Sequence, residues 1–223
     1  MKRCVVFIVG IAVMSGLAGP ASAQDSLPPS APDSAAASQL SQIVNAVRAN
    51  GLPADPIIAM ARLGALTHAP SARIVAAARL VAARLATART ALAPKPSAAD
   101  IAAGEDALSI GVQADALRVV RAASPNRSVA VPLGVLAQLV ASGVPTKRAM
   151  TMVTDLMKQG VTNTQLVALG NDVNADVARG ARPEASLETR MGGLTAVLAP
   201  GASSVGAAFT GSSVPTGPKK PQP

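Results

Sequence analysis

The chain has 223 residues, with 20 lysines and arginines against 12 acidic residues, which gives a formal net charge of +8. It has no Trp or Tyr, two Phe, one Cys and one His. Aromatic side chains supply the stacking surfaces for bases and many hot spots of tight interfaces, so this composition argues against nucleic-acid and tight small-ligand binding. One His and one Cys also fall short of the usual zinc ligand set. We therefore expect no metal or other cofactor.

Residues 1–23 predict a cleavable secretory signal peptide. A cationic start precedes an uncharged apolar run over 4–17, which contains the only cysteine and is shorter than the roughly 18 to 20 residues that span a bilayer. Ala21 and Ala23 supply the small side chains that signal peptidase requires, so cleavage is expected before Gln24. This pattern predicts a periplasmic or extracellular protein, with a bacterial envelope as the expected setting.

Two segments flank the expected folded part of the chain. Residues 24–36 and 200–223 are rich in Pro, Ser, Ala and Gly, and they cannot bury enough apolar surface to offset the entropy of ordering them. Both are therefore predicted to be disordered. The remaining segment, 37–199, is predicted to form a helical domain, because it lacks the period-two alternation that is typical of strands.

A recurring junction, a Gly followed by an apolar residue, divides this segment. The glycines are Gly51, Gly143, Gly160 and Gly180, with a weaker copy at Gly111. Such a glycine closes a helix in the left-handed conformation, and the next residue folds back onto the last turn. The Pro or Thr that follows several of these junctions then suits the start of the next helix.

The junctions predict about nine short helices: 37–49, 54–66, 71–92, 97–109, 113–123, 128–141, 146–158, 162–178 and 184–198. Ser71 and Ser97 are the expected N-caps of two of them, and Thr162 with Gln165 fits a capping box. Short connections favour antiparallel neighbours. The predicted fold is all-α, either an irregular α-solenoid-like array of helical hairpins or a compact helical bundle.

Apolar spacing indicates which helix faces are buried. The helix over 162–178 has a stripe with helical spacing: Leu166, Leu169, Val173 and Val177. The corresponding series in the helix over 146–158 is Met150, Val153 and Met157. The most apolar stretch, 129–144, is interrupted by Pro, Gly and Gln, and predicts a buried helix and not a membrane span.

Few residues suggest catalysis. His68 lies at a predicted helix end without a nucleophile motif such as G-x-S-x-G, and its expected role is to interact with the terminal carbonyls. The acidic pairs Glu105–Asp106 and Asp172–Asp176 lack the D-x-D-x-D-G pattern of a cation loop, and solvated helix faces are the expected interpretation. We predict no catalytic residue and no enzyme; a hydrolase that uses these residues is the weakest alternative.

Cations concentrate over 48–95, with seven of them against one acid: Arg48, Arg62, Arg73, Arg79, Arg84, Arg89 and Lys95. One interpretation is a basic surface for anionic lipid or polymer. The favoured interpretation is internal pairing. The helix over 71–92 should run antiparallel to that over 97–109, whose acids would then lie alongside the arginines.

The expected function is that of a non-catalytic scaffold or adaptor that binds a protein partner in the cell envelope. Small Ala-rich faces allow close helix packing, while loops and unused grooves remain for the partner. The alternative is a basic envelope-surface protein that binds anionic lipid or polymer through residues 48–95, with Lys219 and Lys220 in support. Nucleic acid is not an expected partner.

Overall fold

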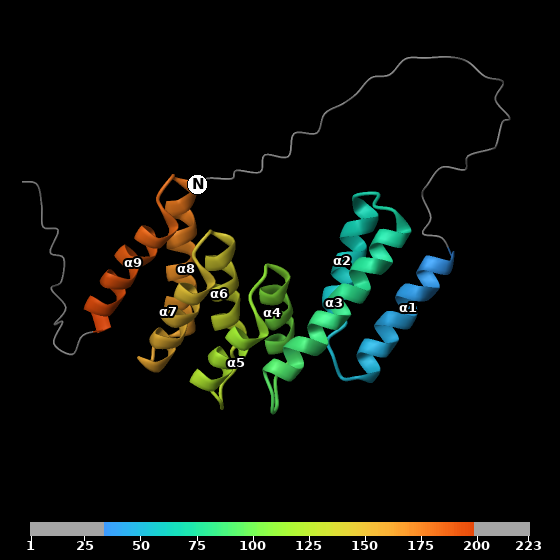
Figure 1. Cartoon of the computed structure of the whole chain (residues 1–223), viewed down its shortest axis with the longest axis horizontal. Helices are drawn as coiled ribbons and strands as arrows, with labels where there is room; N and C mark the ends of the chain where they lie inside the picture. Colours follow the sequence, from blue (N-terminus) through green and yellow to red (C-terminus); the bar gives the residue numbers. More distant parts are fainter. Residues whose placement is uncertain (1–33, 199–223) are drawn as a thin grey trace, which may run out of the picture. The chain divides into compact units, whose positions relative to one another are not determined.

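A computed structural model of the chain describes residues 34–198. In this range it contains nine α-helices and no strand, which confirms the all-α prediction. The helices are α1 (Ser34–Ala49), α2 (Asp55–Leu66), α3 (Ser71–Ala91), α4 (Ala98–Ser109), α5 (Ala114–Ala123), α6 (Ala130–Ala141), α7 (Thr146–Lys158), α8 (Asn163–Ala178) and α9 (Pro183–Leu198) (Figure 1). The predicted signal peptide, the predicted linker up to residue 33 and the predicted tail over 200–223 lie outside the described residues.

The largest difference in helix bounds is at the start of α1. Residues 34–36 were expected to belong to the linker, but they form the first turn of this helix. Ala36 is buried. A Ser-Ala-Ala-Ala start has high helix propensity, and burial of Ala36 adds to it, so the helix begins earlier than the composition suggested.

The predicted glycine junctions are present at all five positions, with positive φ at Gly51, Gly111, Gly143, Gly160 and Gly180. In each, the glycine N–H and the next N–H donate to carbonyls of the last helical turn, as with the Leu52 N–H and the Val47 oxygen at 3.0 Å. The residue after the glycine is buried in four junctions: Leu52, Val112, Val144 and Val161. Ala181 is exposed in the fifth. The junctions are therefore Schellman motifs.

Two of the three predicted N-caps are confirmed. Ser97 and Thr162 accept hydrogen bonds from the N3 backbone N–H groups and form capping boxes, Ser97 with Asp100 and Thr162 with Gln165. The prediction for Ser71 was wrong, because this residue is the first residue of α3 and the N-cap is Pro70. The extended backbone of Pro70 lets its carbonyl accept the first helical hydrogen bonds, so no side-chain cap forms.

The helices contact one another in two rows. The odd-numbered helices α1, α3, α5 and α7 contact in succession, and so do α4, α6 and α8. Every helix pair with substantial contact is adjacent in the chain or separated by a single helix. Among the described helices this pattern is typical of an open α-solenoid-like array, and it selects the first of the two predicted architectures over a closed bundle.

Helix α6 is among the most buried helices of the array. Leu133, Leu136 and Leu139 are fully buried, and the helix contacts α4, α5, α7 and α8. The prediction of a buried helix within 129–144 is confirmed. No described helix combines the length and the apolar character needed to cross a membrane.

The predicted buried face is confirmed for α8 and shifted for α7. In α8, Leu166, Leu169 and Val173 are buried. Val177, the fourth residue of the predicted stripe, is partly buried and packs against the core. In α7, Met150 and Met157 are only half-buried, whereas the fully packed stripe is Ala149, Met152, Val153 and Leu156. This series also has helical spacing, and small Ala149 lets the helix approach its neighbours on that side.

At Gly104, α4 packs closely against α3. A Cβ atom at this position would lie 2.9 Å from the Ala88 Cβ and 3.1 Å from a methyl group of Leu92. The Ala88 Cβ is fixed to the backbone and cannot rotate away. Gly134 in α6 is the matched case, because a Cβ there would have no heavy atom within 4 Å.

We expect Gly104→Ala to lower the free energy of unfolding by about 1 kcal/mol, since overpacking costs about 1–3 kcal/mol and outweighs the helix-propensity gain of roughly 1 kcal/mol. Gly134→Ala keeps only the gain and should raise the free energy of unfolding by about 0.5–1 kcal/mol. Urea unfolding followed by circular dichroism measures both. A similar stabilisation by the two substitutions would contradict the close packing at Gly104.

Candidate functional site

The basic segment lies mainly on the surface of α1–α3. Six of its seven cations are exposed: Arg48, Arg62, Arg73, Arg79, Arg89 and Lys95. Of the seven, Arg84 alone forms an ion pair with an acid of the described residues, at 3.7 Å from Glu105. Helices α3 and α4 do pack together as expected, but only this position of α3 faces an acid of α4. The expected internal pairing is therefore limited to one arginine.

The two parts of the array differ in charge. Residues 34–97 carry a net charge of +6, whereas residues 98–198 have equal numbers of cations and acids. Most cations of the second part are paired, in Asp115–Arg118, Asp100–Arg121, Glu188–Arg148, Asp155–Lys158, Asp176–Arg179 and Asp176–Arg190. The unneutralised positive charge of the described residues is thus concentrated on α1–α3 and their connections.

A groove of about 590 Å³ lies between α1 and α3. Its lining is mainly small or aliphatic: Ile43, Ala46, Val47, Leu52, Ala82 and Ala86. Its polar lining residues are Asn50, Thr90, Arg79 and Arg89. We call this the α1–α3 groove.

Both arginines of the α1–α3 groove are tied to α1. Arg79 donates from Nη2 to Oε1 of Gln39 at 3.1 Å, near the start of α1. Arg89 donates from Nη1 to the carbonyl oxygen of Asn50, directly after the end of α1. The order of these contacts shows that α1 and α3 run in the same direction, with one arginine toward each end of the groove.

A second cavity, of about 440 Å³, lies among α1, α2 and α3. Its walls are apolar residues such as Leu40, Ile57 and Ile74, and two cations, Arg48 and Arg62, also line it. Leu63 and Leu66, on the last turns of α2, are 62% and 78% exposed. Large apolar side chains are thus exposed beside the cations of this region.

The acidic pair on α8, Asp172 and Asp176, is not simply a solvated face, because it contacts side chains of α9. We call these contacts the α8–α9 brace. Asp176 accepts from Nε and Nη2 of Arg190, each at 2.9 Å, and from the hydroxyl of Ser186 at 2.8 Å. Arg179 donates to it as well. These hydrogen bonds hold the pKa of Asp176 well below its usual range. Asp172, on the same helix, lies 3.4 Å from Arg190.

This brace borders a cavity of about 660 Å³ between α8 and α9. Asp176 already accepts four hydrogen bonds, so it has little capacity left for a cation or a water nucleophile. Among the described residues, no group of three His, Cys, Asp or Glu side chains is arranged to hold a metal ion.

The acidic pair on α4 is divided between interior and surface. Glu105 is buried and faces Arg84, whereas Asp106 is exposed. Burial, reinforced by the neighbouring Asp106 charge, raises the pKa of Glu105, and Arg84 opposes this rise. The two carboxylates therefore do not converge on one site.

His68 has a backbone role. It is exposed, with φ of 52°, and its N–H donates to the Ala65 oxygen at 3.1 Å while the Ala69 N–H donates to the Gly64 oxygen at 2.9 Å. This is the same Schellman geometry as in the glycine junctions, with His68 in the glycine position at the end of α2. The position of His68 at a helix end was predicted from the sequence, but its left-handed conformation was not.

His68→Gly should therefore raise the free energy of unfolding by about 0.5 kcal/mol, because glycine has no Cβ and adopts the left-handed conformation without strain. The greater conformational freedom of Gly in the unfolded chain offsets part of this gain. Urea unfolding provides the measurement. His68→Ala is the control: it removes the imidazole but keeps the Cβ strain, so its stability should stay within about 0.5 kcal/mol of the parent. An equal gain from Ala would refute the backbone explanation.

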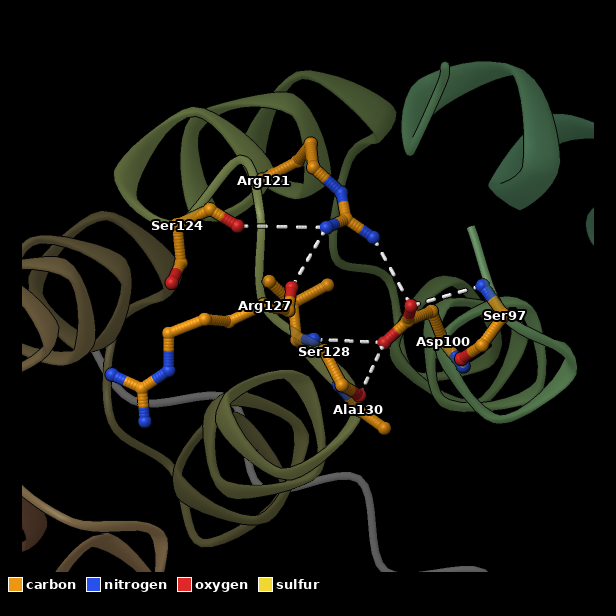
Figure 2. Close-up of polar contacts among 8 residues, drawn as sticks. Ser97, Asp100, Arg121, Ser124, Arg127, Ser128 and Ala130 are labelled. Carbon is orange, nitrogen blue, oxygen red and sulfur yellow. Dashed lines mark hydrogen bonds and ion pairs between the residues drawn. The ribbon is translucent and has the colours of Figure 1, made fainter. Parts of the chain in front are cut away.

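Figure 2 shows a polar cluster, centred on the buried Asp100, that was not predicted from the sequence. Asp100, which is 2% exposed, accepts hydrogen bonds from the Ser128 hydroxyl and the Val129 N–H, both at 2.8 Å. Arg121 of α5 donates to it from Nη2 at 3.1 Å, and also donates to the Arg127 carbonyl oxygen at 2.9 Å. The cluster joins α5 to the N-terminal ends of α4 and α6.

The ionised form of Asp100 is strongly favoured. Burial by itself raises the pKa of this carboxyl, but the hydrogen bonds from Ser128, Ser97 and Val129 outweigh burial and lower the pKa to about 2. All the partners of Asp100 are donors of the fold itself. The cluster therefore stabilises the array and offers no open position for a substrate.

The predicted cleavage residues Ala21, Ala23 and Gln24 lie outside the described residues.

Within the described range, the α1–α3 groove combines a concave apolar lining with arginines that have no acidic partner. Comparisons with protein-family models, with curated proteins and with solved structures gave no match. The α1–α3 groove and the basic surface around it are the candidate functional site.

Proposed function

We propose that this protein is an exported, non-catalytic helical scaffold that binds a protein partner in the cell envelope through α1–α3. One observation carries the proposal: residues 34–97, which have a net charge of +6, also form two cavities with mainly apolar walls. Apolar concave surfaces supply binding energy, and charge supplies orientation and faster association. An acidic partner surface is the expected complement.

Crosslinking and affinity capture of the tagged mature chain from its native envelope test this proposal. A protein crosslinked to α1–α3, and still retained at about 500 mM salt, is the expected result, because apolar contacts persist when exposed charges are screened. A capture that yields no protein crosslinked to these helices would contradict it. Sequencing of the mature N-terminus tests export separately, with Gln24 as the expected first residue.

Binding to anionic lipid is the second candidate, and the exposed Leu63 and Leu66 beside Arg62 favour it. Large apolar side chains next to cations suit the interface of an anionic bilayer. Co-sedimentation with vesicles that contain phosphatidylglycerol distinguishes the two functions. Binding that is strong at about 50 mM salt, collapses at about 500 mM salt and is lost in Leu63→Ser/Leu66→Ser would favour lipid over the protein partner.

A further inference from the structure

We propose that the α1–α3 groove is the docking site for an acidic amphipathic helix of the protein partner. The inference rests on the proposed scaffold function and specifies its site and the chemistry of its partner. The lining of the groove includes the small side chains of Ala46, Ala82 and Ala86, which we call its floor. Arg79 and Arg89 also line the groove and lie along α3. Small floor residues let another helix approach closely, as at helix–helix contacts generally.

The two arginines set the charge pattern of the partner. They are separated by ten residues on one helix, which corresponds to about 15 Å along its axis. Each guanidinium has five N–H donors, and the bonds to Gln39 and Asn50 leave others for a carboxylate. No acid of the described residues forms an ion pair with either arginine. The groove therefore suits a ligand with two carboxylates about 15 Å apart.

The lining favours a helix over an extended peptide. An extended segment would place unpaired backbone N–H and C=O groups on a mainly apolar floor, whereas a helix satisfies these groups internally. The Thr90 hydroxyl donates to the Ala86 carbonyl oxygen, and the Asn50 amide donates to the Ala46 carbonyl oxygen, so both groups already bond within the groove walls. The groove helices also have no open strand edge for a peptide to extend.

On a helical ligand, carboxylates 11 residues apart lie on nearly the same face and about 16 Å apart. Small or aliphatic side chains between them, at helical spacing, would face the alanine floor. The inferred occupant is thus a helix of about four turns with an acidic residue near each end of its apolar stripe.

The probe for this inference is a synthetic helical peptide of about 16 residues with an Ala/Leu stripe and two Glu residues 11 positions apart. A peptide of the same composition with the stripe scrambled is its control. Fluorescence anisotropy gives the dissociation constant for the mature chain and for four variants, each checked by circular dichroism for unchanged helix content.

The variants separate the groove from the general positive charge. Arg79→Glu/Arg89→Glu should weaken binding about tenfold or more, because two charge-assisted contacts become repulsive. Arg73→Glu/Lys95→Glu changes the net charge equally but lies outside the groove lining, and should weaken binding less than about threefold. A similar loss in both double variants would overturn the proposal in favour of a diffuse basic surface.

A second pair of variants tests the apolar floor without changing charge. Ala86→Leu fills the groove and should also weaken binding about tenfold, whereas Ala83→Leu, on an exposed position outside the lining, should leave it unchanged. Absence of binding up to about 1 mM peptide, or equal binding of the scrambled peptide, would overturn the proposal.

Failure of this inference is distinguishable from failure of the proposed function. A protein captured from the envelope with undiminished yield by both Arg79→Glu/Arg89→Glu and Ala86→Leu would remove the groove assignment and leave the scaffold function intact. An envelope capture without any protein crosslinked to α1–α3 would remove the scaffold function itself.

Discussion

Asp100→Ala is expected to lower the free energy of unfolding by about 3–5 kcal/mol, the largest effect that we predict for a single substitution. The change leaves Arg121, whose side chain is 10% exposed, as a buried cation without its carboxylate. It also removes the acceptor of the Ser128 hydroxyl and of the Val129 N–H. Unpaired buried donors and an uncompensated charge are each costly, so the loss exceeds that of an ordinary surface ion pair.

Asp115→Ala is the matched control, because it removes an acid whose side chain is 86% exposed and whose partner, Arg118, lies one turn away on α5. Its effect should be below about 1 kcal/mol. Asp100→Asn, which retains one acceptor oxygen but no charge, should fall between the two. Urea unfolding of all three variants gives the comparison. Similar losses for Asp100→Ala and Asp115→Ala would show that the buried cluster contributes no special stability.

The position of this cluster explains why its loss affects more than one helix. Each helix of the array makes its substantial contacts with near neighbours in the chain, so cooperation along the array depends on the interfaces between neighbouring helices. Asp100 lies in the first turn of α4, the helix that packs against both α3 and α6. The cluster holds α4 in place against α5 and the start of α6, and α4 in turn packs against α3, so loss of the cluster should also weaken the interface between α3 and α4.

Most helix bounds could be predicted from the sequence because the signals that end these helices are local. A glycine in the left-handed conformation and the apolar residue after it both act within one turn, as Gly51 with Leu52 and Gly160 with Val161 show. The left-handed conformation of His68 was not predicted, because at this helix end a residue other than glycine occupies the position after the last turn. The nearby Pro70 was the signal that a helix ends there.

The polar contacts could be predicted less well, because they depend on how separate helices face one another. Asp100 and Arg121 are 21 residues apart, and no local pattern relates them. Two signals did exist. Ser97 and Asp100 have the spacing of a capping box, and Arg121 lies one helical turn after the fully buried Leu117. A cation within an apolar stripe predicts a buried partner, although not which one.

The surface charge shows the same limit. Sequence alone favoured pairing of the arginines of α3 with the acids of α4, since the two helices were expected to be neighbours. They are neighbours, but a helix pair brings only its facing positions together. Arg84 faces Glu105, whereas Arg79 and Arg89 point toward α1 and bond to uncharged groups. The rotation of a helix about its axis, which composition does not determine, thus decides that the arginines of the α1–α3 groove have no acidic partner within residues 34–198.

Acidification should destabilise the protein through the same buried cluster, by about 2 kcal/mol between pH 5 and pH 1. The pKa of Asp100 is lowered from 3.8 to about 2, so the folded protein favours the ionised carboxylate more than the unfolded chain does. This stabilisation is complete above the unfolded pKa and disappears as the pH falls through the folded pKa. Other carboxylates also titrate here, Asp176 in the same direction and Glu105 in the opposite one.

A comparison of the wild type with Asp100→Asn isolates the contribution of Asp100, because the amide cannot titrate while the other carboxylates remain. The difference in free energy of unfolding between the two proteins should be constant above about pH 5 and should shrink by about 2 kcal/mol on acidification. Urea titrations at a series of pH values measure it. A difference that stays constant from pH 5 to pH 1 would mean that Asp100 has the same pKa in both states. The hydrogen bonds from Ser128, Ser97 and Val129 would then not favour its ionised form.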